Sequence, residues 1–413
     1  MGDTPGKGVR QRRVLCGSCG ETAAGEMRHR TEHIKEEPFS VRGYGKGARG
    51  ELKMSKVLIV TNHSYMLYRF RKELVQRLAA EHDVVISTPF VGHEEDLEQL
   101  GARCICTDVD RRGMNPLKDL KLMQHYREIL HVEQPDFVVT YSIKPNIYMG
   151  MICRMMGVPY YANVQGLGSA FENKKLAAIV TPLYRMALKK ASRVFFENAA
   201  NAREFLDLRV VSKNKITVLP GAGINLDEYS YQPYPAAAPL RFLYLGRIMK
   251  EKGMDEWFYA IRRLKKEYGE AVAFDMVGFF EDEYKERVEK LQAEGVIEFY
   301  GFQSEPRPYY AKAGCVVLPS YHEGLSNVLL EAAAMGRPVV TSDVAGCREA
   351  VVDGQTGYLC PAKSGEALYN SMKRMLELSA DMREEMGRKG CQFVKDNFAK
   401  ERVVEKTVCT LAQ

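Results

Sequence analysis

Two carboxylates, Glu323 and Glu331, stand eight residues apart in the segment best suited to chemistry. Glu323 lies in a polar turn that follows the apolar run 315–318, and Glu331 lies one turn inside a predicted helix. Ser326 is a suitable N-cap for this helix, and Gly336 is a suitable end signal. Free N–H groups at such a helix start attract phosphate, whereas the two acids suit hydroxyl groups. The stretch therefore suggests a nucleotide-sugar site.

A second charged turn, residues 246–253, follows another predicted strand. Arg247 can place two donors on phosphate oxygens, and Lys252 adds a point charge five residues later. If this turn is considered alone, a solvated surface turn explains its charges about as well as a phosphate-binding site does. Together with the pair Glu323 and Glu331, phosphate binding is the better interpretation.

The surrounding sequence predicts the elements that position these turns. Apolar runs of strand length alternate with amphipathic helical segments, which indicates an α/β fold of parallel, doubly wound sheets. Residues 229–239 hold three prolines and no periodicity, so they are expected to be a linker between two Rossmann-like domains. Ligands of such sheets bind at the carboxyl ends of the strands. The expected strands are 57–60, 84–86, 104–106, 137–139, 242–245, 273–277, 296–300, 315–318 and 339–341, and the expected helices are 68–80, 117–132, 148–156, 254–268, 281–294, 365–378 and 381–397.

Composition narrows the class of protein. The 413 residues are 46% hydrophobic and 27% charged, as in ordinary globular proteins of two domains. No apolar run is long enough to span a bilayer, and the ten cysteines follow no disulfide pattern, so a cytoplasmic location is expected. No basic helix typical of nucleic-acid binding is present. Residues 1–53 are rich in Gly, Arg and Glu and have few apolar residues, which suggests a disordered extension or a misread start upstream of Met54. Zinc binding by Cys16, Cys19, His29 and His33 is disfavoured by their spacing.

Several segments of the sequence resemble a known protein family. The segments 246–253 and 324–340, with Glu323 and Glu331, resemble the nucleotide-sugar half of the family 4 retaining glycosyltransferases. The closing segment 346–354 fits the same family. The resemblance covers about residues 55–400. Segments 143–148 and 166–171 resemble the branch that elongates lipid-linked oligosaccharides for capsule, O-antigen or N-glycan synthesis.

The resemblance implies GT-B architecture, in which two Rossmann-like domains face a central cleft. Residues 54–228 would bind the acceptor, residues 240–395 would bind the nucleotide sugar, and residues 396–413 would form a C-terminal helix, with a return to the first domain as one option. The implied reaction transfers a hexose or N-acetylhexosamine, with a UDP-sugar as the expected donor, to a polyprenyl-diphosphate-linked saccharide. Configuration would be retained, and no metal or other cofactor would be required.

The resemblance also implies roles for single residues. Arg247 and Lys252 would neutralise the donor diphosphate and the charge that develops on the leaving group. Glu323 would contact sugar hydroxyls, and Glu331 would bind the ribose. Arg247, Lys252 and Glu323 are thus the expected catalytic residues. The full set expected to bind the donor is Gly246, Arg247, Lys252, Glu323, Gly324, Leu325, Ser326, Asn327, Val328 and Glu331.

The acceptor side contains a departure from the family. Many relatives have histidine where this chain has Gln165, and a neutral amide cannot act as a base. Asn62, His63 and Arg69 are candidates near the acceptor, although a histidine at such a turn, as at His63, is more often a structural polar residue. Lys144 is a candidate for the lipid diphosphate, with a solvated lysine as the alternative.

Residues 173–196 form a basic, amphipathic segment. Such a segment can lie on an anionic membrane surface, or it can simply pack one face on the sheet. The two interpretations are compatible. The protein is accordingly expected at the cytoplasmic face of the membrane, bound peripherally.

Two other functions are compatible with the architecture. A nucleotide-sugar epimerase also uses two facing α/β domains, but the spacing of Glu323 and Glu331 is not typical of it. A non-catalytic binding subunit is disfavoured because Arg247, Lys252, Glu323 and Glu331 are all present.

Overall fold

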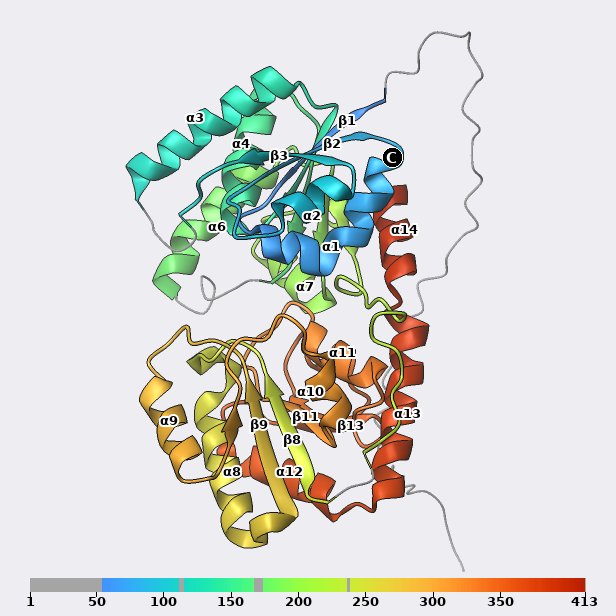
Figure 1. The fold of residues 1–413 in the computed structure, drawn as a ribbon. Helices are drawn as coiled ribbons and strands as arrows, with labels where there is room; N and C mark the ends of the chain where they lie inside the picture. The colour runs from blue at the N-terminus through green and yellow to red at the C-terminus, as the bar shows by residue number, and fades with distance from the viewer. Residues whose placement is uncertain (1–53, 111–114, 167–173, 236–237, 413) are drawn as a thin grey trace, which may run out of the picture. The chain divides into compact units, whose positions relative to one another are not determined.

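The computed structural model describes residues 54–110, 115–166, 174–235 and 238–412, and contains two parallel β-sheets (Figure 1). The first sheet has the order β3-β2-β1-β4-β5-β6-β7. Its strands are β1 (Lys56–Val60), β2 (Asp83–Thr88), β3 (Ala102–Cys106), β4 (Phe137–Tyr141), β5 (Tyr160–Val164), β6 (Arg193–Phe196) and β7 (Ile216–Val218). The helices between them are α1 (Ser64–Ala79), α2 (Glu94–Gln99), α3 (Pro116–Glu133), α4 (Ile143–Met156), α6 (Lys174–Leu188) and α7 (Ala199–Asp207).

Different helices cover the two faces of the first sheet. Leu58 and Val60 belong to the core beneath α3, α4 and α6, whereas Val57 and Ile59 belong to the core beneath α1. Alternate residues of a strand point to opposite faces, so a continuous apolar run is required when both faces are buried. This explains why β1 is apolar throughout after Lys56.

The second sheet has the order β10-β9-β8-β11-β12-β13. Its strands are β8 (Leu240–Leu245), β9 (Val272–Val277), β10 (Glu298–Phe299), β11 (Cys315–Leu318), β12 (Val339–Ser342) and β13 (Gly357–Cys360). Its helices are α8 (Met254–Tyr268), α9 (Lys285–Ala293), α10 (Arg307–Lys312), α11 (Asn327–Ala334), α12 (Gly365–Glu377) and α13 (Ala380–Asn397). Helix α8 packs on α12, and α11 packs on α13.

The final helix, α14 (Lys400–Leu411), packs on α1 of the first sheet. Lys400 donates to the carbonyl oxygen of Phe70 at 2.9 Å, and the Tyr161 hydroxyl donates to the carbonyl oxygen of Leu411 at 2.9 Å. Where the chain leaves α13, the N–H of Ile224 donates to the carbonyl oxygen of Phe398 at 2.8 Å. The C-terminal segment is therefore bonded to the segment that leaves the first sheet.

The predicted fold class, two parallel α/β sheets of Rossmann type, is confirmed. The bounds of α8 are as predicted, and Ser326 is the N-cap of α11, because its side chain accepts from the N–H of Leu329. The alternation of apolar and polar residues in the sequence was sufficient to predict these elements.

Other predicted bounds were wrong. Helix α4 begins at Ile143 instead of residue 148, because Pro145 lies in the first turn, where no intrahelical N–H bond is required. Helix α1 begins at Ser64 instead of residue 68, and α9 begins only at Lys285. The basic segment 173–196 is not one helix: α6 ends at Leu188, and Arg193 begins strand β6.

Several predicted features fall outside the described residues. These are the extension 1–53 with its Cys and His residues, and most of the segment 166–171. Strands β5, β6, β7 and β13, and helices α2, α7 and α10, are elements that the sequence patterns did not identify.

Candidate active site

A cleft of about 1690 Å³ is lined by residues of both sheets and their helices. The described lining residues include the predicted donor residues Gly246, Arg247, Lys252, Glu323, Gly324, Leu325, Ser326, Asn327 and Val328, and the predicted acceptor-side residues Asn62, His63, Lys144 and Gln165. Both predicted groups therefore line the same cleft. Glu331 is absent from the described lining and is buried behind it, with 5% of its surface exposed.

On the donor side, the carboxylate of Glu323 is held by two hydrogen bonds. Lys252 Nζ lies 2.5 Å from Glu323 Oε1, and the Ser320 hydroxyl donates to the same oxygen at 2.7 Å. Burial opposes ionisation, but Lys252, Ser320 and Arg247 together lower the pKa of Glu323. Glu323 is therefore an ionised acceptor at neutral pH.

Arg247 pairs with a residue that the sequence patterns did not identify. Its Nη1 lies 2.8 Å from Glu281 Oε2, and both residues line the cleft. Arg247 is 45% exposed, whereas Glu281 is 12% exposed. The guanidinium is thus held by a carboxylate and still accessible to a ligand in the cleft.

The turn before α11 touches the first sheet directly. Asn198 donates to the carbonyl oxygen of Gly324 at 2.5 Å. A Cβ added at Gly324 would lie 1.6 Å from the carbonyl oxygen of Gln165, so only glycine permits this approach. The backbone of Leu325 also bonds Glu197, a buried glutamate that accepts from Arg71 Nη2 at 2.6 Å.

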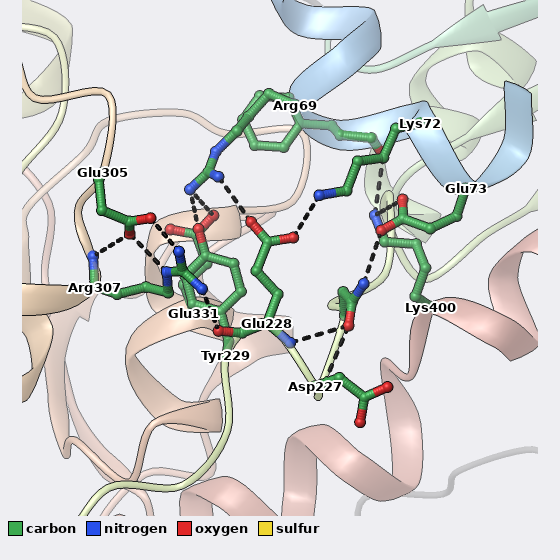
Figure 2. Close-up of polar contacts among 12 residues, drawn as sticks. Arg69, Lys72, Glu73, Asp227, Glu228, Tyr229, Glu305, Arg307, Glu331 and Lys400 are labelled. Atoms are coloured by element: carbon green, nitrogen blue, oxygen red, sulfur yellow. Dashed lines mark hydrogen bonds and ion pairs between the residues drawn. The ribbon is translucent and has the colours of Figure 1, made fainter. Parts of the chain in front are cut away.

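Glu331 belongs to a polar network shown in Figure 2. The Tyr310 hydroxyl donates to Glu331 Oε2 at 2.9 Å, and Arg69 Nη2 lies 3.8 Å from Oε1. Burial raises the pKa of Glu331 to about 7, although Arg69 and Tyr310 oppose this shift. Glu331 is therefore poised to change charge near neutral pH.

Arg69 connects this network to α1 and to the chain between the sheets. It pairs with Glu228 at 3.1 Å and also donates to the Tyr229 hydroxyl. Lys72 pairs with the second oxygen of Glu228 at 2.7 Å (Figure 2). Arg69, a candidate for the acceptor side, is thus bonded to the helix that carries Glu331.

The predicted acceptor-side residues also have partners. Lys144 Nζ lies 2.7 Å from Asp119 Oδ1, and the Tyr148 hydroxyl donates to Asp119 Oδ2 at 2.8 Å. Asp119 is a lining residue that sequence reasoning missed. It stands 25 residues before Lys144, so no local spacing indicates the contact.

The remaining acceptor-side residues complete this wall of the cleft. Asn62 accepts from the Ser142 hydroxyl at 2.7 Å, and Gln165 Nε2 lies 3.3 Å from Met66 Sδ. His63 is the N-cap residue of α1, without a side-chain capping bond. Gln165 therefore contributes both a side-chain amide to the cleft wall and a carbonyl oxygen to the contact with Gly324.

Two further lining residues, Phe279 and Phe302, were also missed by sequence reasoning. They follow β9 and β10, are 43% and 53% exposed, and their rings lie 5.9 Å apart. The ring of Tyr65 on α1 lies 6.2 Å from that of Phe302. Exposed aromatic rings at strand ends are suited to stacking on a flat ligand.

Family models match most of the described chain. One, described as glycosyl transferase 4-like, matches residues 56–198, and another, described as glycosyl transferases group 1, matches residues 234–393. The chain is a family 4 glycosyltransferase. Its transferase identity disfavours the epimerase and the non-catalytic subunit.

Solved structures show that this glycosyltransferase has the GT-B fold. Anabaena HepE in complex with UDP and glucose aligns with a TM-score of 0.72 at 16% identity, covering 87% of this chain and 99% of that one. A glycosyltransferase from Rickettsia africae aligns with a TM-score of 0.70 at 18% identity, covering 86% and 97%. At such identities the likeness concerns the fold alone.

Two curated relatives resemble the glycosyltransferase over most of its length. The N,N'-diacetylbacillosaminyl-diphospho-undecaprenol alpha-1,3-N-acetylgalactosaminyltransferase of Campylobacter jejuni is 26% identical over 331 residues, covering 75% of this chain and 86% of the relative. The capsular polysaccharide biosynthesis glycosyltransferase CapM of Staphylococcus aureus is 24% identical, covering 72% and 81%. Both act as glycosyltransferases according to their names.

The described residues contain neither a cluster suited to a metal ion nor a helix suited to crossing a membrane. No group of three or more His, Cys, Asp or Glu side chains there could hold a metal ion. None of the described helices combines the length and the apolar character that crossing a membrane requires.

Proposed function

We propose that this glycosyltransferase moves a hexose or N-acetylhexosamine from a UDP-sugar to a polyprenyl-diphosphate-linked saccharide, with retention of configuration, in the synthesis of a cell-surface polysaccharide or glycan. The observation that carries the proposal is the single cleft lined by Arg247, Lys252 and Glu323 on one side and by Lys144 and Gln165 on the other. Two substrates that react with each other need such a shared site. The Campylobacter relative supports the lipid-linked acceptor, because its name contains diphospho-undecaprenol.

The donor side supplies the charge stabilisation. Arg247 and Lys252 would face the diphosphate, and their positive charge would stabilise the nucleoside diphosphate as it leaves. The N-terminus of α11, capped by Ser326, adds partial positive charge at the same wall. Glu323, ionised and fixed by Lys252, would accept hydrogen bonds from the sugar hydroxyls.

The donor diphosphate itself would act as the proton acceptor. The acceptor hydroxyl would enter on the face from which the diphosphate departs, and a phosphate oxygen would take its proton. No side chain is then needed as a base, which is compatible with the neutral amide at Gln165. Because Arg247 and Lys252 neutralise the diphosphate, the proposed reaction requires no metal ion.

The aromatic pair Phe279 and Phe302 offers a place for the nucleobase. Their exposed rings line the cleft beside Arg247 and Glu281, at the ends of β9 and β10. A base stacked there would leave its diphosphate near Arg247. The name of the HepE structure, which holds UDP and glucose, supports a uridine donor.

The proposed membrane partner is an anionic surface at the cytoplasmic face, contacted by α6. Tyr184, Ala187 and Leu188 of this helix pack on the first sheet, whereas Ile179 and Met186 are 51% and 47% exposed. Arg185 is bonded to the carbonyl oxygens of Leu208 and Arg209, so it supports the fold rather than the surface.

The direct test is a panel of labelled nucleotide sugars with lipid-linked saccharide acceptors, with and without EDTA. We expect transfer from one UDP-sugar, unchanged by EDTA, and a product whose anomeric coupling constant matches the donor's. No transfer from any donor would refute the proposal, an inverted product would refute retention, and loss with EDTA would refute metal independence. Conversion of the nucleotide sugar to its epimer in the absence of an acceptor would support the epimerase function instead.

The pH dependence of donor binding tests whether Glu331, which is buried and absent from the cleft lining, acts on the ribose as the family resemblance implies. Because the pKa of Glu331 is about 7, the carboxylate gains its charge as the pH rises from about 6 to 8. A charged acceptor binds ribose hydroxyls more strongly, so we expect UDP affinity to increase over this range. The charged and titratable groups facing Glu331 are Arg69, Tyr310, Glu228, Lys400 and Tyr65.

Substitutions show whether Glu331 or another titrating group causes the pH dependence of UDP binding. Glu331→Gln is expected to weaken UDP binding by roughly 10-fold at pH 8 and to flatten the pH dependence. Burial also raises the pKa of Glu197 to about 7, so Glu197→Gln is the matched control and should preserve the slope. A slope that persists in Glu331→Gln and disappears in Glu197→Gln would contradict the assignment. Binding is measured by calorimetry from pH 5.5 to 8.5.

A further inference from the structure

Part of the cleft wall is apolar and has no role in donor binding. Its side chains come from three neighbouring helices, α3, α4 and α6 (Figure 1). We call this part the α3–α4–α6 groove. Its defining residues are Leu120, Met123, Ile147, Leu176, Ile179 and Leu183, all of which line the cleft.

The groove lies beside a polar cluster and includes exposed apolar side chains. Lys144, Asp119 and Tyr148 are bonded to one another beside Ile147, and Lys144 and Asp119 are each only 13% exposed. In contrast, Leu120 is 62% exposed and Ile179 is 51% exposed. The six defining side chains carry no hydrogen-bonding group.

The cleft is large enough for more than one ligand. Small-molecule sites commonly enclose roughly 300–1,000 Å³, whereas this cleft measures about 1690 Å³. A nucleotide sugar held by Arg247, Lys252 and Glu323 would leave the α3–α4–α6 groove open. A peptide would leave its backbone N–H and C=O groups without partners against the apolar walls of the groove.

We propose that the α3–α4–α6 groove binds the first isoprene units of the lipid-linked acceptor, with Lys144 facing the diphosphate. This inference rests on the proposed function and adds the place of the lipid. The matching property is a cation, Lys144, beside an apolar wall that includes the exposed side chains of Leu120 and Ile179. Asp119 holds Lys144 in position until a diphosphate competes for it.

Binding of lipid diphosphates tests this groove without requiring catalysis. The full chain is titrated by calorimetry with inorganic diphosphate, geranyl diphosphate and farnesyl diphosphate, with saturating UDP to occupy the donor site. Each buried methylene increases affinity roughly fourfold, so farnesyl diphosphate should bind at least 10-fold more tightly than geranyl diphosphate. Equal affinities for all three probes would overturn the inference.

Substitutions of exposed groove residues should leave the fold intact, so that a loss of binding can be assigned to the groove itself. Leu120→Asp and Ile179→Asp are expected to weaken farnesyl diphosphate binding by at least 10-fold and to leave inorganic diphosphate and UDP binding within twofold. Met155→Asp is the matched control, because Met155 is 74% exposed on α4 and lies outside the cleft lining. Equal losses in the groove variants and in Met155→Asp would overturn the inference.

Kinetics separate this inference from the proposed function. With an active donor, groove variants should raise the KM for an undecaprenyl-linked acceptor and not the KM for the same saccharide without lipid. Equal changes for both acceptors would overturn the groove while leaving the transferase intact. If no acceptor is glycosylated but farnesyl diphosphate binds as described, the proposed reaction fails and the lipid groove stands.

Discussion

Lys252→Met is expected to lower kcat by roughly 100- to 1,000-fold, the effect typical of removing one group that stabilises charge in a transition state. The ammonium of Lys252 lies in the cleft, 2.5 Å from Glu323, and is 13% exposed. Its loss removes positive charge from the diphosphate site and leaves the buried carboxylate of Glu323 without its cation. Steady-state transfer and donor hydrolysis both measure the effect.

A control and a double variant separate charge stabilisation from folding. Lys250→Met changes a neighbouring exposed lysine outside the described cleft lining and should keep kcat within twofold. Adding Glu323→Gln to Lys252→Met removes the unpaired charge, so the melting temperature should recover while kcat stays low. Recovery of kcat in the double variant would show that Lys252 acts only on stability.

Gly324→Ala is expected to reduce kcat/KM by roughly 100-fold, because a displacement of about 1 Å at a reacting centre can cost that much. The added Cβ would lie 1.6 Å from the carbonyl oxygen of Gln165 and 2.9 Å from Glu197 Oε2. The first of these atoms belongs to the backbone and cannot rotate away. The turn before α11 must therefore retreat from the first sheet.

The matched control for Gly324→Ala is Gly390→Ala. A Cβ at Gly390, within α13, would meet its nearest neighbour at an ordinary contact distance of 3.5 Å. Alanine is favoured over glycine in a helix by about 1 kcal/mol, so this variant should be at least as stable and fully active. Wild-type kcat/KM in Gly324→Ala would show that the Gln165 contact is not needed for turnover.

The sequence was most informative where a signal is local. The cap at Ser326 and the alternation of apolar strands with helices depend on residues a few positions apart, and these predictions were confirmed. The partners of the site residues follow from tertiary folding instead. Arg247 pairs with Glu281, 34 residues away in the sequence, and Lys144 pairs with Asp119, 25 residues away. At such sequence separations, the spacing of residues gives no information about which side chains meet.

The start of α4 illustrates a different limit. The sequence Lys144-Pro145 favours a loop by local propensity, yet proline is compatible with a first helical turn. Packing of α4 between α3 and α6 decides the outcome. Lys144 consequently lies on a helix next to Asp119, rather than in a strand-end loop.

The return of α14 to the first sheet affects how the protein is made. Val404, Val408 and Leu411 belong to the core that contains Val57 and Ile59 of β1. During synthesis, the strands of the first sheet emerge long before this last part of their core. Because the N-terminal half of a chain generally folds first, this half must keep an apolar strip uncovered until α14 has been synthesised. A fragment that retained all seven strands but ended before α14 would leave the same strip uncovered.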